Sequence, residues 1–163
     1  MDHSELGRQI GLPKEKMDAH KIESEVHWKH GWIAYDKTVK TQKIKEYNRP
    51  DIIVADRRRN MITIVEIGIT NQENLVETEN IKRGKYEHLI ENLNAQTLNQ
   101  QTRTRVISYV MTWEGIVTKD HTTHRQSLGI SDLSEAHIQR VVIQETQKLV
   151  LRDMKPREDY DTE

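Results

Sequence analysis

Residues 50–67 read PDIIVADRRRNMITIVEI, and this stretch decides the fold. Two runs rich in β-branched residues, 52–55 and 61–67, flank a short polar segment, which is the pattern of a β-hairpin. Pro50 has no backbone N–H to donate to a sheet, so the first strand should begin at or after it. We therefore expect two antiparallel strands joined by a turn at residues 57–60.

Two carboxylates occupy matching places in this hairpin. Asp51 lies six positions before Arg57, and Glu66 lies six positions after Asn60. The two acids should therefore lie directly opposite each other on one face, with Cβ atoms about 4.5–5.5 Å apart. Carboxylates this close repel unless they share a cation or a proton, and Mg²⁺ suits such a pair. The alternative is that Asp51 only caps the strand start and Glu66 faces solvent.

The elements before the hairpin follow from the spacing of apolar residues. Met17, Ile22, Val26 and Trp28 recur at roughly helical spacing without an interrupting Gly or Pro, which predicts a helix over residues 14–30. An alternating pattern over residues 33–41 predicts a strand with mixed faces.

After the hairpin, apolar residues recur at helical spacing over residues 74–93, which predicts a helix. Residues 106–111 are mostly apolar and predict a buried strand. Residues 94–104 and 121–129 are polar and predict loops. Ser131 or Ser134 is a suitable cap for a last helix that runs to about Met154. The order helix, three strands, helix, strand, helix predicts an α/β fold with a mixed sheet flanked by helices.

The chain has room for one domain, which we place at residues 14–155. Residues 1–13 are predicted to be a flexible lead-in, and residues 156–163 an acidic flexible tail. There is no cysteine, so disulfides, thiol nucleophiles and cysteine-based zinc sites are excluded. No apolar run has the length of a membrane span.

Two lysines fall on the sheet-facing side of the predicted helix 74–93. Lys82 is seven residues from both Leu75 and Leu89, and Lys85 lies one turn further along. Burying an ammonium group without a partner is costly, and the carboxylate pair would supply that partner. The alternative is that the lysine stems pack on the sheet while the amines reach water.

Two other sets of side chains are candidates for binding. His27 with His30, and His121 with His124, have spacings that suit zinc, but no third ligand follows at a suitable distance. Residues 37–59 carry eight basic and three acidic residues, an excess of five positive charges. Such a stretch can neutralise phosphates without reading bases, or it can be an ordinary solvated face.

Arg49-Pro50-Asp51, Glu66 and the run Lys82-Arg83-Gly84-Lys85-Tyr86 together resemble the PD-(D/E)xK nuclease superfamily, whose fold is restriction-endonuclease-like. The narrower resemblance is to the endonuclease domain at the C-terminus of some non-LTR retrotransposon polyproteins, and it covers roughly residues 28–155. In those elements the domain nicks target DNA to prime reverse transcription. The superfamily's simplest pattern has lysine two residues after the second acid, where this chain has Gly68. In the retrotransposon branch the next helix supplies the lysine.

The resemblance implies an Mg²⁺- or Mn²⁺-dependent endodeoxyribonuclease. Asp51, Glu66 and the backbone carbonyl of Ile67 would hold the metal, and Lys82 or Lys85 would be the catalytic lysine. Glu25, placed on the first helix, would add an outer carboxylate or remain a solvated charge.

DNA contacts are expected from Arg49, Arg57, Arg58 and Arg59. The expected partners are DNA and the other domains of a polyprotein, including a reverse transcriptase, with no membrane and no small-molecule cofactor. The location would be intracellular, and nuclear in a eukaryotic host. Two alternatives stay open: a nuclease-like fold that only binds nucleic acid, and a free-standing junction resolvase or phage nuclease.

Overall fold

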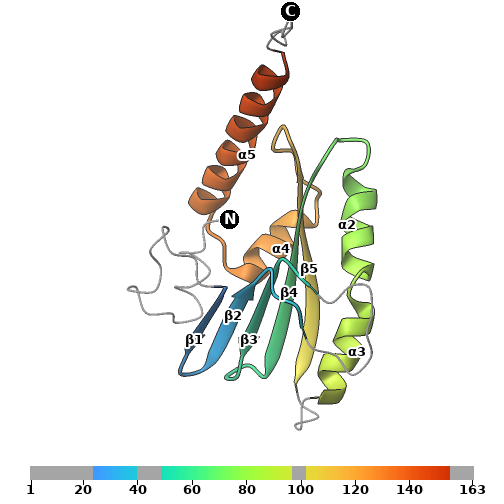
Figure 1. Ribbon diagram of the computed structural model, residues 1–163, viewed down its shortest axis with the longest axis vertical. Helices are drawn as coiled ribbons and strands as arrows, with labels where there is room; N and C mark the ends of the chain where they lie inside the picture. The colour runs from blue at the N-terminus through green and yellow to red at the C-terminus, as the bar shows by residue number, and fades with distance from the viewer. Residues whose placement is uncertain (1–23, 40–48, 97–101, 155–163) are drawn as a thin grey trace, which may run out of the picture.

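One mixed sheet organises the protein in the computed structural model, which describes residues 24–39, 49–96 and 102–154 (Figure 1). Within these residues the sheet has five strands in the order β1-β2-β3-β4-β5. The strands are β1 (Glu25–Trp28), β2 (Gly31–Tyr35), β3 (Ile52–Asp56), β4 (Met61–Thr70) and β5 (Arg103–Thr112). The helices described are α2 (Leu75–Gly84), α3 (Glu87–Gln96), α4 (His121–Leu128) and α5 (Asp132–Asp153).

Strands β1 to β4 are antiparallel neighbours, whereas β5 runs parallel to β4. A parallel pair needs a long crossover, and α2 with α3 supplies it. The predicted α/β class with a mixed sheet is therefore confirmed. The specific restriction-endonuclease-like fold stays a prediction.

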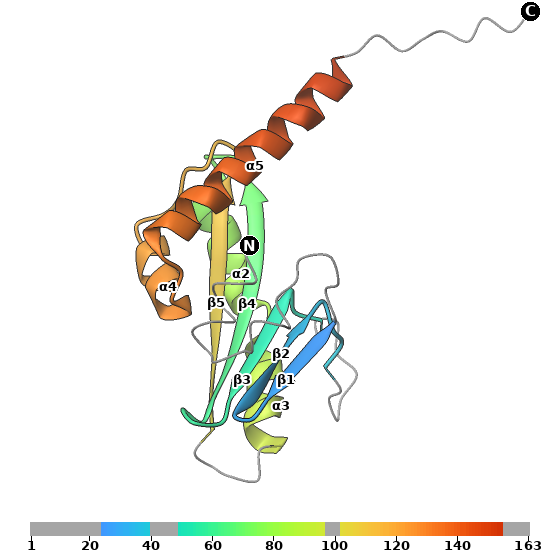
Figure 2. The same ribbon diagram turned by 90° about the vertical axis from the view of Figure 1, so that its left-hand side faces the viewer.

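Helices cover both faces of the sheet, as Figure 2 shows, with α5 in front of the sheet and α2 and α3 behind it. Successive strand residues point to opposite faces, so each face has its own apolar cluster. Ile53, Ile64 and Leu89 belong to the cluster on the α2–α3 face. Val65 and Ile138 belong to the cluster on the α5 face. The protein is thus a helix–sheet–helix sandwich.

The helix predicted over residues 14–30 is wrong where the structure describes it, because residues 25–28 form strand β1. Val26 and Trp28 are two positions apart, so in a strand both point to one face, and both pack in the same apolar cluster. The spacing that suggested a helix at this end was therefore the two-residue period of a strand. Residues 14–23 of the predicted helix, the lead-in 1–13 and the tail 156–163 lie outside the described residues.

Other boundaries also differ from those predicted. The helix expected over residues 74–93 is interrupted at Lys85 and Tyr86, directly after Gly84. The loop expected over residues 121–129 contains helix α4, which ends at Gly129 with a positive φ of 69°. Strand β2 ends at Tyr35 before Asp36, whose φ is also positive, so the strand is shorter than the predicted range 33–41.

The capping of the last helix is as predicted. Ser131 precedes α5, and its hydroxyl accepts a hydrogen bond of 3.1 Å from the backbone N–H of Ser134. Among the helices that the structure describes, none combines the length and the apolarity that a membrane crossing needs.

Candidate functional site

The register of the β3–β4 hairpin brings Asp51 and Glu66 together. Ile52 pairs with Val65, so the next pair outward is Asp51 with Glu66. The two are joined by a hydrogen bond of 3.3 Å from the Asp51 backbone N–H to Glu66 Oε1. Glu66 has no exposed surface, so the alternative in which it faces solvent is wrong. The structure therefore confirms the prediction that the two acids lie opposite each other in the hairpin.

Asp51 is oriented by the backbone of the opposite strand. The Ile67 N–H donates to Asp51 Oδ2 at 2.8 Å. In a strand the N–H and C=O of one residue point to the same edge, so the Ile67 carbonyl also faces the Asp51 side. Oxygen atoms of Asp51, Glu66 and Ile67 therefore gather where β4 runs on past the end of β3.

Both candidate lysines reach the same carboxylate oxygen. Lys82 Nζ lies 3.0 Å from Glu66 Oε2, and Lys85 Nζ lies 3.2 Å from it. The two lysine side chains are about a quarter exposed, at 24% and 29%. Their ammonium groups therefore turn inward to the acid, which is the predicted arrangement and not the one in which the amines escape to water.

Tyr86 is a further member of this cluster, and no role at the site was predicted for it beyond its place in the run Lys82–Tyr86. It is fully buried, and its hydroxyl donates to the backbone carbonyl of Arg49 at 2.9 Å. Lys85 Nζ lies 4.9 Å from the centre of its ring. A buried tyrosine needs a hydrogen-bond partner, and this one lies 37 residues away, so no local pattern in the sequence pointed to it. Tyr86 fixes the chain just before Asp51.

Glu66 is held in its charged form. Burial alone would raise its pKa, but the nearby Tyr86 hydroxyl, the hydrogen bond from Lys82 and the charges of Lys82 and Lys85 outweigh burial, and the pKa is lowered. The same environment raises the pKa of Tyr86, through burial first and then through its contact with Glu66. At neutral pH the cluster therefore contains a charged Glu66 carboxylate and a neutral Tyr86 phenol.

The oxygen atoms of Asp51, Glu66 and Ile67 suit a hard divalent cation that keeps several water molecules as ligands. The described part of the chain contains no group of three or more His, Asp or Glu side chains placed to hold a metal. A cation at this place would rest on two carboxylates and the Ile67 carbonyl. Mg²⁺ is bound in this way in proteins, with water and substrate phosphate completing its shell.

Glu25 does not join the site. It lies on β1 and not on a helix, and β2 separates it from β3. Its carboxylate contacts His27 Nε2 at 2.6 Å and also pairs with Lys37. The predicted position of Glu25 on a helix was wrong because of the helix–strand error in that segment.

The arginines of the turn lie far from the acids. The turn 57–60 joins the lower ends of β3 and β4 in Figure 1, whereas Asp51 directly precedes Ile52 at the other end of β3. Six strand positions at about 3.3 Å each separate Asp51 from Arg57 by roughly 20 Å. Arg49 is close to the site, but its guanidinium pairs with Asp36 at 2.6 Å.

The histidine spacings do not form a zinc site in the described residues. His121 Nε2 contacts Glu135 at 2.8 Å, and His124 Nδ1 contacts Glu79 at 3.2 Å. These carboxylates lie on different helices. The two histidines of α4 thus serve separate partners.

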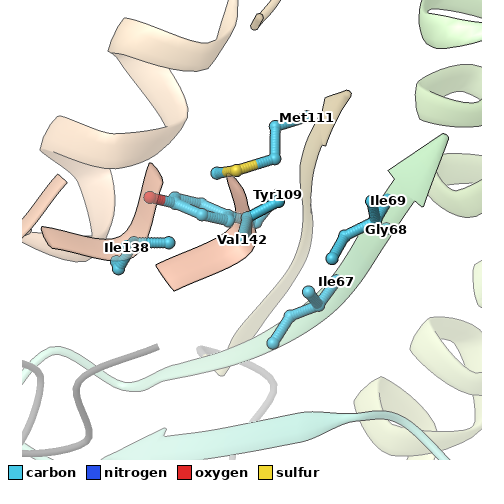
Figure 3. Close-up of a pocket in the computed structure, with 7 residues that line it drawn as sticks. All are labelled: Ile67, Gly68, Ile69, Tyr109, Met111, Ile138 and Val142. Atoms are coloured by element: carbon cyan, nitrogen blue, oxygen red, sulfur yellow. The ribbon is translucent and has the colours of Figure 1, made fainter. Parts of the chain in front are cut away.

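A pocket on the opposite face of the sheet is apolar (Figure 3). Ile67, Ile69 and Met111 line it together with Ile138 and Val142 of α5. Figure 3 also shows Tyr109 at this pocket, and its hydroxyl donates to Glu135. Asp51, Glu66 and the two lysines lie on the other side of β4.

No protein-family model and no curated protein sequence matches this chain. A function must therefore be proposed from the cluster around Glu66 and from the resemblance of its motifs.

Proposed function

We propose that this chain is a metal-dependent DNA endonuclease that nicks DNA by hydrolysing a phosphodiester. The observation that carries the proposal is the meeting of Asp51, Glu66 and two lysines from three separate elements. The two lysines offset the charges of the two acids. A divalent cation held by Asp51 and Glu66 would therefore make the cluster net positive, which suits an anionic substrate.

Asp51, Glu66 and the Ile67 carbonyl would hold Mg²⁺ or Mn²⁺. When bound, the ion polarises a phosphate and lowers the pKa of a water ligand. The protein's own part is orientation, since the Ile67 N–H fixes Asp51 and the Tyr86 hydroxyl fixes the Arg49 carbonyl. A lysine ammonium beside Glu66 can orient the attacking water or stabilise charge on the phosphate.

The proposed partner is DNA, with other domains of a larger polyprotein supplying affinity and target choice. The chain is close to neutral, with a formal net charge of −1, so its own attraction to DNA is modest. We propose Arg49 and the turn arginines as its phosphate contacts. The setting would be a retrotransposon polyprotein with a reverse transcriptase, acting inside the cell and, in a eukaryote, in the nucleus.

Nicking of supercoiled plasmid with and without Mg²⁺ tests the proposal. We expect Mg²⁺-dependent nicking by the parent, none by Asp51→Ala, and parental nicking by Glu77→Ala, which removes an exposed acid of α2. Mg²⁺ should raise the melting temperature of the parent and of Glu77→Ala but not of Asp51→Ala.

Retained nicking by Asp51→Ala would contradict the site. DNA binding by a parent that never nicks would instead favour a nuclease-like fold that only binds nucleic acid. A four-way junction offered beside the plasmid tests for a resolvase.

A further inference from the structure

Gly68 lies on β4 beneath the side chain of Lys82. A Cβ atom built on Gly68 would lie 2.9 Å from Lys82 Cε, 3.1 Å from Lys82 Cδ and 3.2 Å from Val110 Cγ2. The first of these distances is shorter than carbon atoms tolerate. The stem of Lys82 therefore passes through the space that a side chain at position 68 would fill.

The backbone does not explain a glycine here. Gly68 is in the middle of a regular strand pair, opposite Val110, and its φ is not among the positive values. Glycine inside a strand weakens it and often marks a place where another group comes close. Here the group that comes close is Lys82.

We propose that Gly68 is a positioning residue for the site lysine: the missing side chain opens the path by which Lys82 crosses β4 to Glu66. An effect of Gly68 on catalysis rests on the proposed function. The path of the Lys82 side chain past Gly68 does not. Lys82 Nζ ends 3.0 Å from Glu66 Oε2, two positions back along the same face of β4. A side chain at position 68 would therefore force the end of Lys82 off its present path to Glu66.

A side chain at position 68 should affect the two lysines differently. Lys85 reaches the same oxygen of Glu66, but it is not among the atoms nearest to the Cβ position of Gly68. A methyl group at 68 should therefore displace Lys82 and leave Lys85 in place. The closest two atoms belong to the flexible end of Lys82, and the third, Val110 Cγ2 at 3.2 Å, needs to shift by only a few tenths of an ångström. Gly68→Ala should therefore keep the fold while the ammonium moves.

The test compares Gly68→Ala with Gly84→Ala, a glycine of α2 whose added Cβ meets no atom within 4 Å. Brief acylation of the folded proteins, read by peptide mass spectrometry, reports how well each lysine is held. We expect Lys82 to become several times more reactive in Gly68→Ala while Lys85 is unchanged. Gly84→Ala should match the parent. Parental reactivity of Lys82 in folded Gly68→Ala would overturn the proposal.

Single-turnover nicking gives a second readout. Gly68→Ala should slow nicking at saturating DNA by about a hundredfold, as loss of one charge-stabilising group does, with DNA binding in Ca²⁺ unchanged. The double variant Gly68→Lys/Lys82→Ala carries its ammonium from β4 and should nick faster than Lys82→Ala alone. Equal rates in Gly68→Ala and the parent would contradict the positioning role.

If Gly68→Ala folds poorly, a double-mutant cycle on the free energy of unfolding tests the same contact. If the lysine stem is what the methyl group meets, the loss of stability caused by Gly68→Ala should shrink when Lys82 is already Ala. An equal loss in both backgrounds would overturn the proposal. If the parent does not nick DNA at all, the endonuclease proposal fails, whereas lysine acylation and the double-mutant cycle still decide the role of Gly68.

Discussion

Glu66 is a fully buried acid whose charge is balanced by two lysines on one oxygen. The two lysines are held differently. The stem of Lys82 lies between Gly68 and the rest of α2, whereas Lys85 sits at the helix end above the ring of Tyr86. Two cations so close cannot both gain fully from one carboxylate, so they should have different roles.

We expect Lys82→Ala to lower turnover and Lys85→Ala to weaken DNA binding. Lys82→Ala should reduce single-turnover nicking at saturating DNA by about a hundredfold, because a preorganised charge at the site is lost. Its affinity for DNA in Ca²⁺ should stay close to the parent's. Parental nicking by Lys82→Ala together with an inactive Lys85→Ala would mean that the roles are exchanged.

At the scale of elements, the β3–β4 hairpin has two chemically different ends. The acids lie at its open end, and Arg57, Arg58 and Arg59 lie exposed at its turn. The turn itself is shaped by Asp56, whose Oδ1 accepts from the backbone N–H of Arg58 at 2.9 Å. The guanidinium groups are therefore presented to solvent on a fixed turn, at the opposite end of the hairpin from Asp51 and Glu66.

Replacing Arg57, Arg58 and Arg59 with Gln should weaken DNA binding without changing turnover of bound DNA. The loss should be even across DNA sequences, since phosphate contacts carry no base information. The slope of log affinity against log salt should flatten by up to about 0.9 for each phosphate that the arginines no longer neutralise. A sequence-selective loss would show that the turn reads bases, and unchanged binding would show that it faces away from DNA.

The hairpin and its acids were predictable because their information is local. Strand composition, turn length and the distance of Asp51 and Glu66 from the turn fix the register, and register fixes which side chains meet. Lys82 was predictable for a similar reason, since helical phase placed it on the buried stripe.

Segments β1 and α4 were mispredicted because tertiary contacts decide them. Val26 continues the helical spacing from Ile22, whereas Val26 and Trp28 alone have the two-residue period of a strand, and pairing with β2 selects the strand. The segment 121–128 has few apolar residues, but His121 is buried against Glu135 and Leu128 joins the core. Charge pairs formed with distant helices are not visible in a local pattern. The role of Tyr86 was missed for the same reason, since its partner lies 37 residues away.

At the scale of the whole molecule, α4 connects the two helical layers. His121 contacts Glu135 of α5 on one face of the sheet, and His124 contacts Glu79 of α2 on the other. Helix α4 therefore reaches both layers past β5, the last strand of the sheet. Tyr109 of β5 also donates to Glu135, so a strand and two helices meet at this one carboxylate.

Glu135 should make stability depend on pH below neutrality. Burial would raise its pKa, but hydrogen bonds from His121 and Tyr109 and the charges of His121 and Arg125 lower it below the ordinary 4.5. A carboxyl group with a lowered pKa in the folded state stabilises the protein above that ordinary value. The contribution is lost as the pH falls through the folded pKa.

We expect Glu135→Gln to lower the free energy of unfolding at pH 7 by about 1.5–3 kcal/mol, the range for hydrogen bonds to a charged group. The difference from the parent should shrink as the pH falls below about 4.5, the ordinary value. Urea unfolding at several pH values measures it. Glu145→Gln, on the exposed part of α5, is the control and should follow the parent. A difference that stays constant with pH would contradict the assignment.

The hairpin register also limits how this chain can change length in evolution. Adding or removing one residue within β3 or β4, between an acid and the turn, would move that acid to the opposite face from its partner. One residue added to each strand would leave the acids opposite each other. Related chains that keep the two acids together should therefore change the two strands in step, whereas the turn itself can vary in length. The number of residues between Glu66 and Lys82 is not limited in this way, because a loop and part of a helix separate them.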